Sequence, residues 1–358
     1  MSVDAGNFIH RGNTSSDVLD TSLSMQIGRS LGVVRHDFSQ LTDTLKTLAL
    51  KHRGTLQIGR THGQHAIPQT FGRQVLGWYA EVERGIGRID HAREVIAVGK
   101  CSGEVGTNVF IEPELEELAL KKLGLSPDPA PTQVISRDRH AEVVGLMAVN
   151  GVTLARIATN IRLLSMTELG EVYEGVDLAT QPGSSAMPHK NNPDEAERVG
   201  GLNRRIASTP GEELDASILW LEREISHSST ERSTFPDLFG NLAYATRLMN
   251  DVMNGLVINT DRMLANIDFT YGAIYSSRLL NALIDSGTFS RTDAYEHVKR
   301  LAFKAMGTRV HLRTLAAQDS ALTSLFDKRV LESFFDPQFY LRNIDTAYRR
   351  LGILPKEE

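Results

Sequence analysis

Five short polar stretches hold the residue types that can move protons or bind anions. One of them, "QPGSSAMPHKNNP" at residues 181–193, places two serines, a histidine and a lysine among one glycine and three prolines. Glycine and proline in such number are typical of an irregular segment. The stretch raises the question of what these side chains do there, and the other four stretches help to answer it.

The stretch "GRTHGQHAIPQTFG" carries His62 and His65 between Gly59 and Pro68. A spacing of three could place two metal ligands on one helical face, but the glycine and proline favour a loop, and no Cys or acidic ligand pair lies nearby. We therefore expect no metal here. A histidine held on a loop can act as a general acid, because its ordinary pKa of about 6.5 lies close to neutrality. The alternative is a surface histidine without a catalytic role.

The stretch "HRGNTSSDVLDT", residues 10–21, leads into a helical run. Ser or Thr followed by Asp17 is the pattern of a helix N-cap, which satisfies the first backbone N–H groups. Taken alone, this stretch is explained by the helix start.

The stretch "TQVISRDRHAE", residues 132–142, opens a second helix. Asp138 interacts favourably with the helix dipole, but the dipole does not account for Arg137 and Arg139. The two arginines would suit either ion pairs with another chain or a ligand that bears a carboxylate.

The stretch "EREISHSSTER" holds Arg223, His227, Ser228 and Arg232. A regular helix would not place Arg223 and Arg232 on one face, because nine residues span about two and a half turns. A bend at "SHSS" could bring both guanidinium groups and a serine hydroxyl to one phosphate. The alternative is a surface helix with ion pairs.

Composition limits the function classes. The chain has 358 residues, 41% hydrophobic and 23% charged, which is typical of a globular protein. A net charge of −5 argues against nucleic acid as a partner. No apolar run approaches the roughly 20 residues of a membrane span. The single cysteine, Cys101, rules out an internal disulfide, so we expect a cytoplasmic protein.

Long helical patterns dominate the chain. Apolar residues recur at helical spacing from Arg137 to about Gly170, with a weak point expected at Gly151, and convincing strand patterns are scarce. Similar patterns cover residues 19–50, 68–98 and 234–253. Helices of some thirty residues span roughly 45 Å and pack best side by side. We predict an all-α fold with an elongated central helical bundle at residues 1–267 and a smaller C-terminal helical domain at residues 268–358, in which Ser290 or Thr292 caps a helix.

Together the five stretches resemble the fumarase/aspartase superfamily. "GSSAMPHKNNP" matches every fixed position of the flexible-loop motif GSSxMPxKxNP, and "TQVISRDRHAE", "EREISHSSTER" and "FFDPQFYLRNID" are similar to its adenylosuccinate lyase branch. The resemblance runs from about residue 8 to about residue 351. It implies a homotetramer whose active sites are each shared by three subunits. It also implies a β-elimination that needs neither cofactor nor metal and cleaves adenylosuccinate to AMP and fumarate, together with the matching succinylaminoimidazole carboxamide ribotide step of purine biosynthesis.

The same resemblance implies roles for individual residues. Ser184 matches the base, with Ser185 beside it; Lys190 would stabilise an anion, His62 matches the general acid, and Glu197 matches the acidic partner that orients the histidine. The implied substrate contacts are His10, Arg11, Thr14, Ser15, Thr61, Gln133 and Asn192. Arg223, Ser228 and Arg232 match the phosphate site of the nucleotide. The glycine and prolines of the loop would let it close over a substrate and exclude water.

The sequence departs from the family pattern at its beginning. Only nine residues precede His10, so we expect the family's usual N-terminal domain to be absent. Ser136 and Arg198 also differ from the residues common at these places. A shortened chain, a different substrate or a loss of catalysis would each account for the missing domain.

Two other functions stay open at this point. The "HRGNTSSDVLDT" and "GSSAMPHK" stretches also resemble 3-carboxy-cis,cis-muconate cycloisomerase, whose substrate carries no phosphate. A structural paralogue without catalysis is the alternative from a different class. Binding of AMP would separate the cycloisomerase from the nucleotide lyase.

Overall fold

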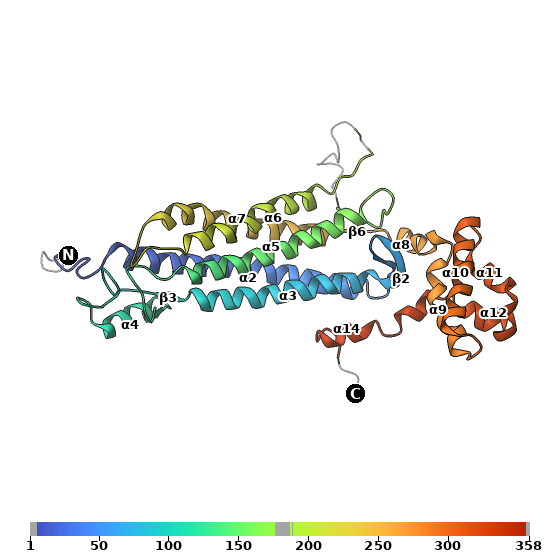
Figure 1. Ribbon diagram of the computed structural model, residues 1–358. Coiled ribbons are helices and arrows are strands. Elements are labelled where there is room, and N and C mark those ends of the chain that lie inside the picture. The colour runs from blue at the N-terminus through green and yellow to red at the C-terminus, as the bar shows by residue number, and fades with distance from the viewer. Residues whose placement is uncertain (1–5, 176–186, 188, 356–358) are drawn as a thin grey trace. The chain divides into compact units, whose positions relative to one another are not determined.

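Helices make up most of the computed structural model, which describes residues 6–175, 187 and 189–355 (Figure 1). The all-α prediction is confirmed. In chain order the longer helices are α2 (Ser15–Lys51), α3 (Phe71–Ile96), α4 (Pro113–Lys122), α5 (Asp138–Leu164), α6 (Asp194–Ala216), α7 (Ser226–Gly255), α8 (Thr260–Ile267), α9 (Ser276–Asp285) and α10 (Arg291–Thr308). The chain ends with α11 (Leu312–Gln318), α12 (Ser320–Leu325), α13 (Lys328–Ser333) and α14 (Asp345–Arg350), and the 3-10 turns are η1 (Asp268–Thr270), η2 (Ala273–Tyr275) and η3 (Pro337–Leu341).

Three small two-stranded sheets accompany the helices. Antiparallel pairs are formed by β1 (Leu56–Thr61) with β2 (Gln64–Thr70) and by β5 (Val172–Tyr173) with β6 (Val257–Ile258). The pair of β3 (Val98–Gly99) with β4 (Ser126–Pro127) is parallel.

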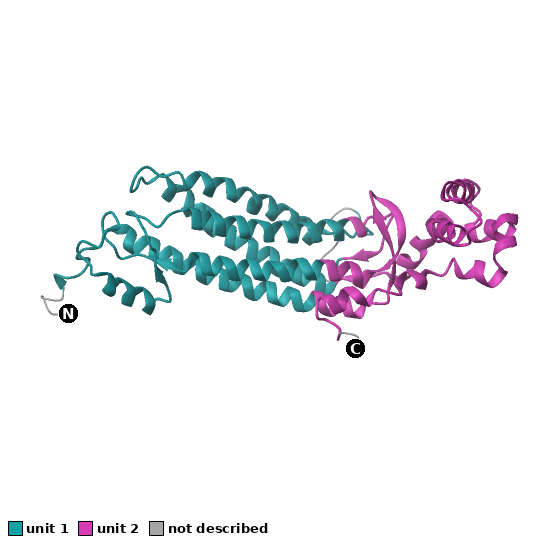
Figure 2. Ribbon diagram, turned by 60° about the horizontal axis from the view of Figure 1, so that its bottom comes forward, with its two compact units in different colours: residues 1–44, 78–162, 174–255 teal, residues 45–77, 163–173, 256–358 magenta. Residues whose placement is uncertain are grey.

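Backbone contacts divide the chain into two compact units (Figure 2). Unit 1 comprises residues 1–44, 78–162 and 174–255, and unit 2 comprises residues 45–77, 163–173 and 256–358. The predicted domain boundary divides the chain once, between residues 267 and 268, whereas each of these units consists of three segments. The predicted boundary stays a prediction.

Unit 1 is a bundle in which α2, α3, α5, α6 and α7 run side by side (Figures 1 and 2). On α2 the buried apolar side chains are separated alternately by four and three residues: Ile27, Leu31, Val34, Phe38 and Leu41. This spacing draws one apolar stripe along about four helical turns. Because the stripe is continuous, the helix can pack along its length rather than at a single crossing point.

The helix α5 is continuous through Gly151, so the predicted weak point is wrong. A Cβ atom added to Gly151 would lie 2.6 Å from Cγ2 of Ile206 on α6. The glycine therefore permits a close approach of two helices rather than a break in one. By length and composition α5 could cross a membrane, but 56% of its apolar window is buried inside the protein, as in the core helix of a soluble protein.

Unit 2 gathers the C-terminal helices and the β1–β2 hairpin. Ile58 of β1 belongs to the same apolar core as Leu279, Leu312 and Leu322 from the helices. The predicted N-cap at Ser290 is confirmed, because its hydroxyl accepts a hydrogen bond of 3.1 Å from the backbone N–H of Asp293.

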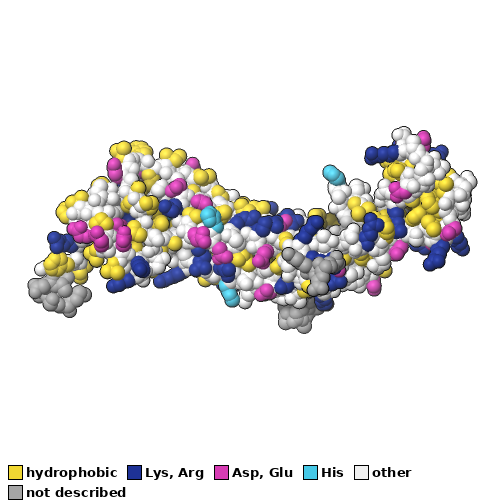
Figure 3. Space-filling model, turned by 90° about the horizontal axis from the view of Figure 1, so that it is seen from below, with side chains coloured by type: hydrophobic (Ala, Val, Ile, Leu, Met, Phe, Trp, Pro, Cys, Tyr) yellow, Lys and Arg dark blue, Asp and Glu magenta, His cyan; other side chains and the backbone are white. Residues whose placement is uncertain are grey.

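The surface carries charges of both signs. On the face drawn in Figure 3, Lys and Arg side chains alternate with Asp and Glu and with scattered apolar groups.

Candidate active site

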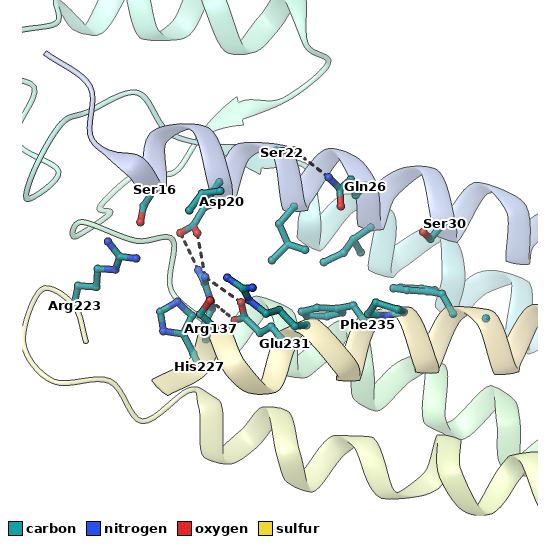
Figure 4. A pocket seen from close by; sticks show the side chains of 18 residues that line it. Ser16, Asp20, Ser22, Gln26, Ser30, Arg137, Arg223, His227, Glu231 and Phe235 are labelled. Carbon is teal, nitrogen blue, oxygen red and sulfur yellow. Dashed lines mark hydrogen bonds and ion pairs between the residues drawn. The ribbon is translucent and has the colours of Figure 1, made fainter. Parts of the chain in front are cut away.

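A pocket of about 530 Å³ in unit 1 lies between the first turns of α2 and α7 (Figure 4). Apolar side chains of both helices line it together with polar groups. A pocket with a few convergent polar groups is the usual form of a small-molecule site. The polar lining comes from three distant parts of the sequence and consists of Ser16, Asp20, Ser22, Gln26, Ser30, Arg137, Arg223, His227, Ser228, Glu231 and Arg232.

Arg223 is held in the pocket by two neutral side chains. Its Nη1 donates to Oγ of Ser15 at 3.1 Å and to Oε1 of Gln133 at 2.8 Å. The backbone N–H of Gln133 in turn donates to the carbonyl of Glu222 at 3.2 Å. Three residues predicted for the site from separate stretches therefore meet in the folded chain.

Ser228 and Arg232 lie on the first two turns of α7 and also line the pocket. They are four residues apart, so they share one helical face. Arg223 precedes the helix, which begins at Ser226. A single long helix would have separated the two arginines; the break before Ser226 brings both to one pocket.

Arg137 forms a buried bridge with two carboxylates. Its Nη1 and Nη2 donate to the two oxygens of Asp20 at 2.8 and 3.0 Å, and its Nε donates to Oε1 of Glu231 at 2.6 Å. Burial alone would lower the pKa of the guanidinium, but Asp20 and Glu231 outweigh burial and raise it. Burial would likewise raise the pKa of Asp20, but Arg137 holds it below its usual value.

Arg137 and Arg139 were expected to pair with another chain or with a ligand that bears a carboxylate. In the structure both contact groups of their own chain. Arg137 pairs with carboxylates of its own chain. Arg139 lies 3.7 Å from Asp128 and donates to the carbonyl of Val95 at 3.4 Å. His140, which follows them, is completely buried, and burial followed by the charge of Arg137 lowers its pKa to about 3. It is therefore neutral at physiological pH.

The "HRGNTSSDVLDT" stretch forms the predicted helix start. A carboxylate oxygen of Asp17 accepts the backbone N–H of Thr14 at 2.7 Å, and the same side chain forms a buried ion pair with Lys100. His10 and Arg11 precede the helix in a turn, where both are exposed, and the Arg11 guanidinium lies 5.5 Å from the centre of the Phe8 ring.

His62 lies in unit 2 at the tip of the β1–β2 hairpin rather than in an irregular loop. His62 and Gly63 form the two-residue turn with φ of 54° and 74°. Two successive positive φ angles are typical of the tightest hairpin turns, and a histidine rarely adopts one. His62 is exposed there, and so is Thr61 at the end of β1. The hairpin escaped prediction because its strands lack regular apolar alternation.

A buried carboxylate anchors the base of that hairpin. Glu171 accepts hydrogen bonds from Gln57 at 2.8 Å, from Arg60 at 2.5 Å and from Asn266 at 2.7 Å. With three charged or amide donors around it, this carboxylate needs no water. The network ties β1 to α8 and to the segment before β5.

The loop motif lies only partly within the described residues. Ser184 and Ser185 fall outside them. Lys190 is exposed, and Asn192 is half-buried just before α6. Glu197, in the first turn of α6, lies 3.9 Å from Arg162. Arg198, where the family pattern differs, donates to Glu195 at 2.8 Å on the same helix.

Comparison with known proteins places the chain in a family. The profile described as Lyase matches residues 1–208, and the profile described as adenylosuccinate lyase C-terminus matches residues 272–351. Adenylosuccinate lyase of Thermotoga maritima is 41% identical over 343 residues, which is 96% of this chain and 79% of the relative. The chain belongs to the adenylosuccinate lyase family of the fumarase/aspartase superfamily. Adenylosuccinate lyase of Synechocystis is 42% identical over 98% of this chain and 81% of its own length.

Solved structures of other members of the superfamily share the fold of this adenylosuccinate lyase family chain. The 3-carboxy-cis,cis-muconate lactonizing enzyme from Pseudomonas putida has a TM-score of 0.87 at 27% identity, covering 98% of this chain and 78% of its own. Fumarate lyase from Mesorhizobium has a TM-score of 0.88 at 26% identity, covering 98% and 79%. The fold is therefore common to several reactions, and the sequence relatives distinguish the branch.

Not all predicted residues of this adenylosuccinate lyase family chain come together. Lys190 lies just before the start of α6 and Arg223 lies beyond its end. The 23 residues of α6 extend over about 34 Å at 1.5 Å per residue. Within one chain the loop end and the Arg223 pocket are therefore too far apart to touch one small molecule.

Three functional candidates were missed by sequence reasoning. Asp20, Glu231 and Glu213 are buried acids near the pocket. Burial and then the charge of Glu231 raise the pKa of Glu213 to about 7. Asp20 and Glu231 stand inside the stretches already singled out, but no spacing rule links acids 211 residues apart along the chain.

Proposed function

We propose that the protein is a C–N lyase that cleaves adenylosuccinate to AMP and fumarate, and the succinylaminoimidazole carboxamide ribotide to its aminoimidazole product and fumarate, in purine biosynthesis in the cytoplasm. The observation that carries the proposal is the pocket of Arg223, Ser228 and Arg232. Among the described residues neither Arg223 nor Arg232 pairs with a carboxylate, unlike Arg137. Two uncompensated guanidinium groups beside a hydroxyl suit a phosphate dianion.

The reaction assigns work to the remaining predicted residues. A base removes the proton from the carbon next to a carboxylate of the succinyl group, and the electron pair moves into that carboxylate. Ser184, with Ser185 beside it, is the proposed base, and Lys190 stabilises the resulting negative charge. The C–N bond then breaks, and His62 gives its proton to the departing nitrogen.

The other predicted contacts lie around the fumarate-forming part of the substrate in this proposal. Glu197 orients His62, and the contacts are His10, Arg11, Thr14, Ser15, Thr61, Gln133 and Asn192. In the structure Ser15 and Gln133 accept hydrogen bonds from Arg223. A hydroxyl and an amide can accept from Arg223 while still offering donors to a ligand.

A homotetramer with shared active sites fits this division of residues. Within a chain the helix α6, about 34 Å long, lies between Lys190 and Arg223. A substrate that needs both residues must therefore lie between two copies of the chain. This separation supports the shared site. When two bundles pack in opposite directions, the Lys190 end of one bundle lies beside the Arg223 end of the other.

The test compares turnover and AMP binding across two arginine variants. The purified protein should release fumarate from adenylosuccinate and bind AMP. Arg223→Met should weaken AMP binding by about 10- to 100-fold, as expected from the loss of a charged hydrogen-bond donor worth about 1.5 to 3 kcal/mol. Arg35→Met is the matched control, because Arg35 forms an exposed ion pair with Asp90 on the same bundle.

The outcomes separate the functions. Equal AMP binding by Arg223→Met and wild type would remove Arg223 from the phosphate site. Absence of both fumarate release and AMP binding would overturn the nucleotide lyase. The cycloisomerase alternative is not favoured, because the relatives at about 41% identity carry the name adenylosuccinate lyase.

A further inference from the structure

Arg137 connects α2 and α7, the two helices between which the pocket lies. Its partner Asp20 lies on α2 and its partner Glu231 lies on α7, and all three side chains are buried. Figure 4 shows the guanidinium group between the two carboxylates. We call these three side chains the Arg137 bridge. A bidentate arginine fixes both the distance and the orientation of its partners, which a single hydrogen bond cannot do.

The bridge lies one helical turn from the residues that line the mouth of the pocket. Asp20 follows Ser16 by four residues on α2, and Glu231 follows Ser228 by three and precedes Arg232 directly on α7. Residues three or four apart share a helical face. A shift of α7 relative to α2 at the bridge would therefore move Ser228 and Arg232 away from Arg223.

The bridge also leaves Arg137 without charge to offer a ligand. Asp20 and Glu231 both accept hydrogen bonds from its guanidinium group, although burial raises the pKa of Glu231. Asp20 additionally accepts the backbone N–H of Ile135 at 2.8 Å, and Arg137 donates to the carbonyl of Ile135 at 2.8 Å. The bridge is thus saturated from within the chain, and only Arg223 and Arg232 remain for an anion at the pocket.

We propose that Arg137 is a positioning residue that sets the geometry of the phosphate pocket without binding the ligand. This inference rests on the proposed function, since the pocket takes the phosphate of the nucleotide. It assigns Asp20 and Glu231 a part in substrate affinity although both are acids beside an anion site. The bridge acts by holding α2 and α7 in register.

Neutral variants of Asp20 and Glu231 test the proposal, because the positioning role and electrostatics predict different changes in the affinity for AMP. Glu231→Gln and Asp20→Asn each replace a carboxyl group beside the pocket by a neutral amide, so electrostatics alone predicts no weakening of AMP binding and, where the carboxyl group is ionised, tighter binding. The same is expected if a released Arg137 binds the phosphate. The positioning role predicts weaker binding instead, roughly tenfold for the loss of about one charged hydrogen bond. AMP affinity is measured by calorimetry on the intact protein.

A matched control separates charge from position. Asp90→Asn also neutralises an acid that binds an arginine of α2 through two hydrogen bonds, but that pair is exposed. It should leave AMP affinity within about twofold of wild type, because exposed ion pairs contribute little.

Hydrogen exchange gives a second measurement that does not depend on the ligand. Backbone amides of residues 226–232 should exchange faster in Glu231→Gln than in wild type or Asp90→Asn, because α7 loses an anchor at its first turns. Unchanged exchange, or tighter AMP binding in Glu231→Gln, would overturn the positioning role. If wild type itself fails to bind AMP, the proposed function falls, and the exchange measurement still decides whether the bridge holds α7.

Discussion

Charge compensation divides the arginines around the pocket into two kinds. Arg137 lies between Asp20 and Glu231 and is neutralised inside the fold. Within the described part of the chain, Arg223 donates only to the neutral side chains of Ser15 and Gln133. An arginine keeps its attraction for an incoming anion only when no carboxylate of its own chain already uses it. The difference in partners, rather than the residue type, therefore decides which arginine binds a ligand.

At the loop motif, replacing Ser184 by Ala should abolish the release of fumarate while leaving the fold intact. The alanine cannot accept the proton next to the substrate carboxylate, and a group acting as a base contributes on the order of 10²- to 10⁴-fold to the rate. Steady-state turnover of adenylosuccinate and circular dichroism measure the two effects. Ser185→Ala is the neighbouring control: full activity in Ser184→Ala together with its loss in Ser185→Ala would transfer the base role to Ser185.

Glu213 should make the protein less stable as the pH rises. Its folded pKa of about 7 exceeds the usual value of 4.5 because of burial and of the charges of Glu231 and Glu212, opposed by Arg137. Between pH 4.5 and about pH 7, Glu213 therefore keeps its proton in the folded state but has lost it in the unfolded state. The stability this gives is complete below pH 4.5 and is lost by about pH 7, which corresponds to at most about 3 kcal/mol.

The variant Glu213→Gln, which stays neutral at every pH, should be the more stable protein at pH 8 and lose this dependence. Urea unfolding at pH 5 and pH 8 measures the difference in the free energy of unfolding. Asp215→Asn, at an exposed position of the same helix, serves as the control. Equal pH dependence in Glu213→Gln and wild type would mean that Glu213 is ionised in the folded protein.

At the scale of elements, two helices of the bundle approach closely only because one position has no side chain. An added Cβ at Gly151 of α5 would lie 2.6 Å from Cγ2 of Ile206 and 3.0 Å from Oδ1 of Asn203, both on α6. The branched Ile206 side chain has little freedom to withdraw. The contact between α5 and α6 therefore depends on this glycine.

Gly151→Ala should destabilise the protein by about 1 to 3 kcal/mol despite the higher helix propensity of alanine. Gly145→Ala in the same helix is the matched control, because among the described residues no atom beyond its own stretch of helix lies within 4 Å of its added Cβ. That variant should be stabilised or neutral by thermal unfolding. A Gly151→Ala protein as stable as Gly145→Ala would show that α6 can move aside at no cost.

The separation of the predicted site residues belongs to the scale of the whole molecule. Lys190 and Arg223 lie beyond opposite ends of α6, so neither chain alone can surround a nucleotide with both. If two copies of the bundle packed in opposite directions, Lys190 of one copy would lie near Arg223 of the other. The exposed position of Lys190 is consistent with a partner or a substrate there.

Mixing two inactive variants should restore part of the activity. Ser184→Ala removes the proposed base from the loop end, and Arg223→Met removes the proposed phosphate contact from the pocket end. Co-refolding both produces mixed oligomers in which some sites draw both intact residues from different chains. Fumarate release is compared with that of each variant refolded alone. No activity above the separate variants would place each site within one chain.

The sequence by itself determined the family, the helical architecture and the identity of most residues proposed for the site. The loop motif is specific, and long runs of apolar residues at helical spacing depend only on local order along the chain. Of the two caps predicted for one helix, Ser290 and Thr292, the structure has Ser290. The β1–β2 hairpin was not predicted, because its strands carry no regular alternation.

Only the tertiary structure decided which residues share a site and which arginine keeps its charge. The bridge of Asp20, Arg137 and Glu231 joins residues separated by more than 90 positions, and the closeness of Gly151 to Ile206 joins two helices. Such contacts depend on how helices pack, which local spacing does not encode. The helix α6, about 34 Å long, likewise separates Lys190 from Arg223, because a helix is rigid along its axis.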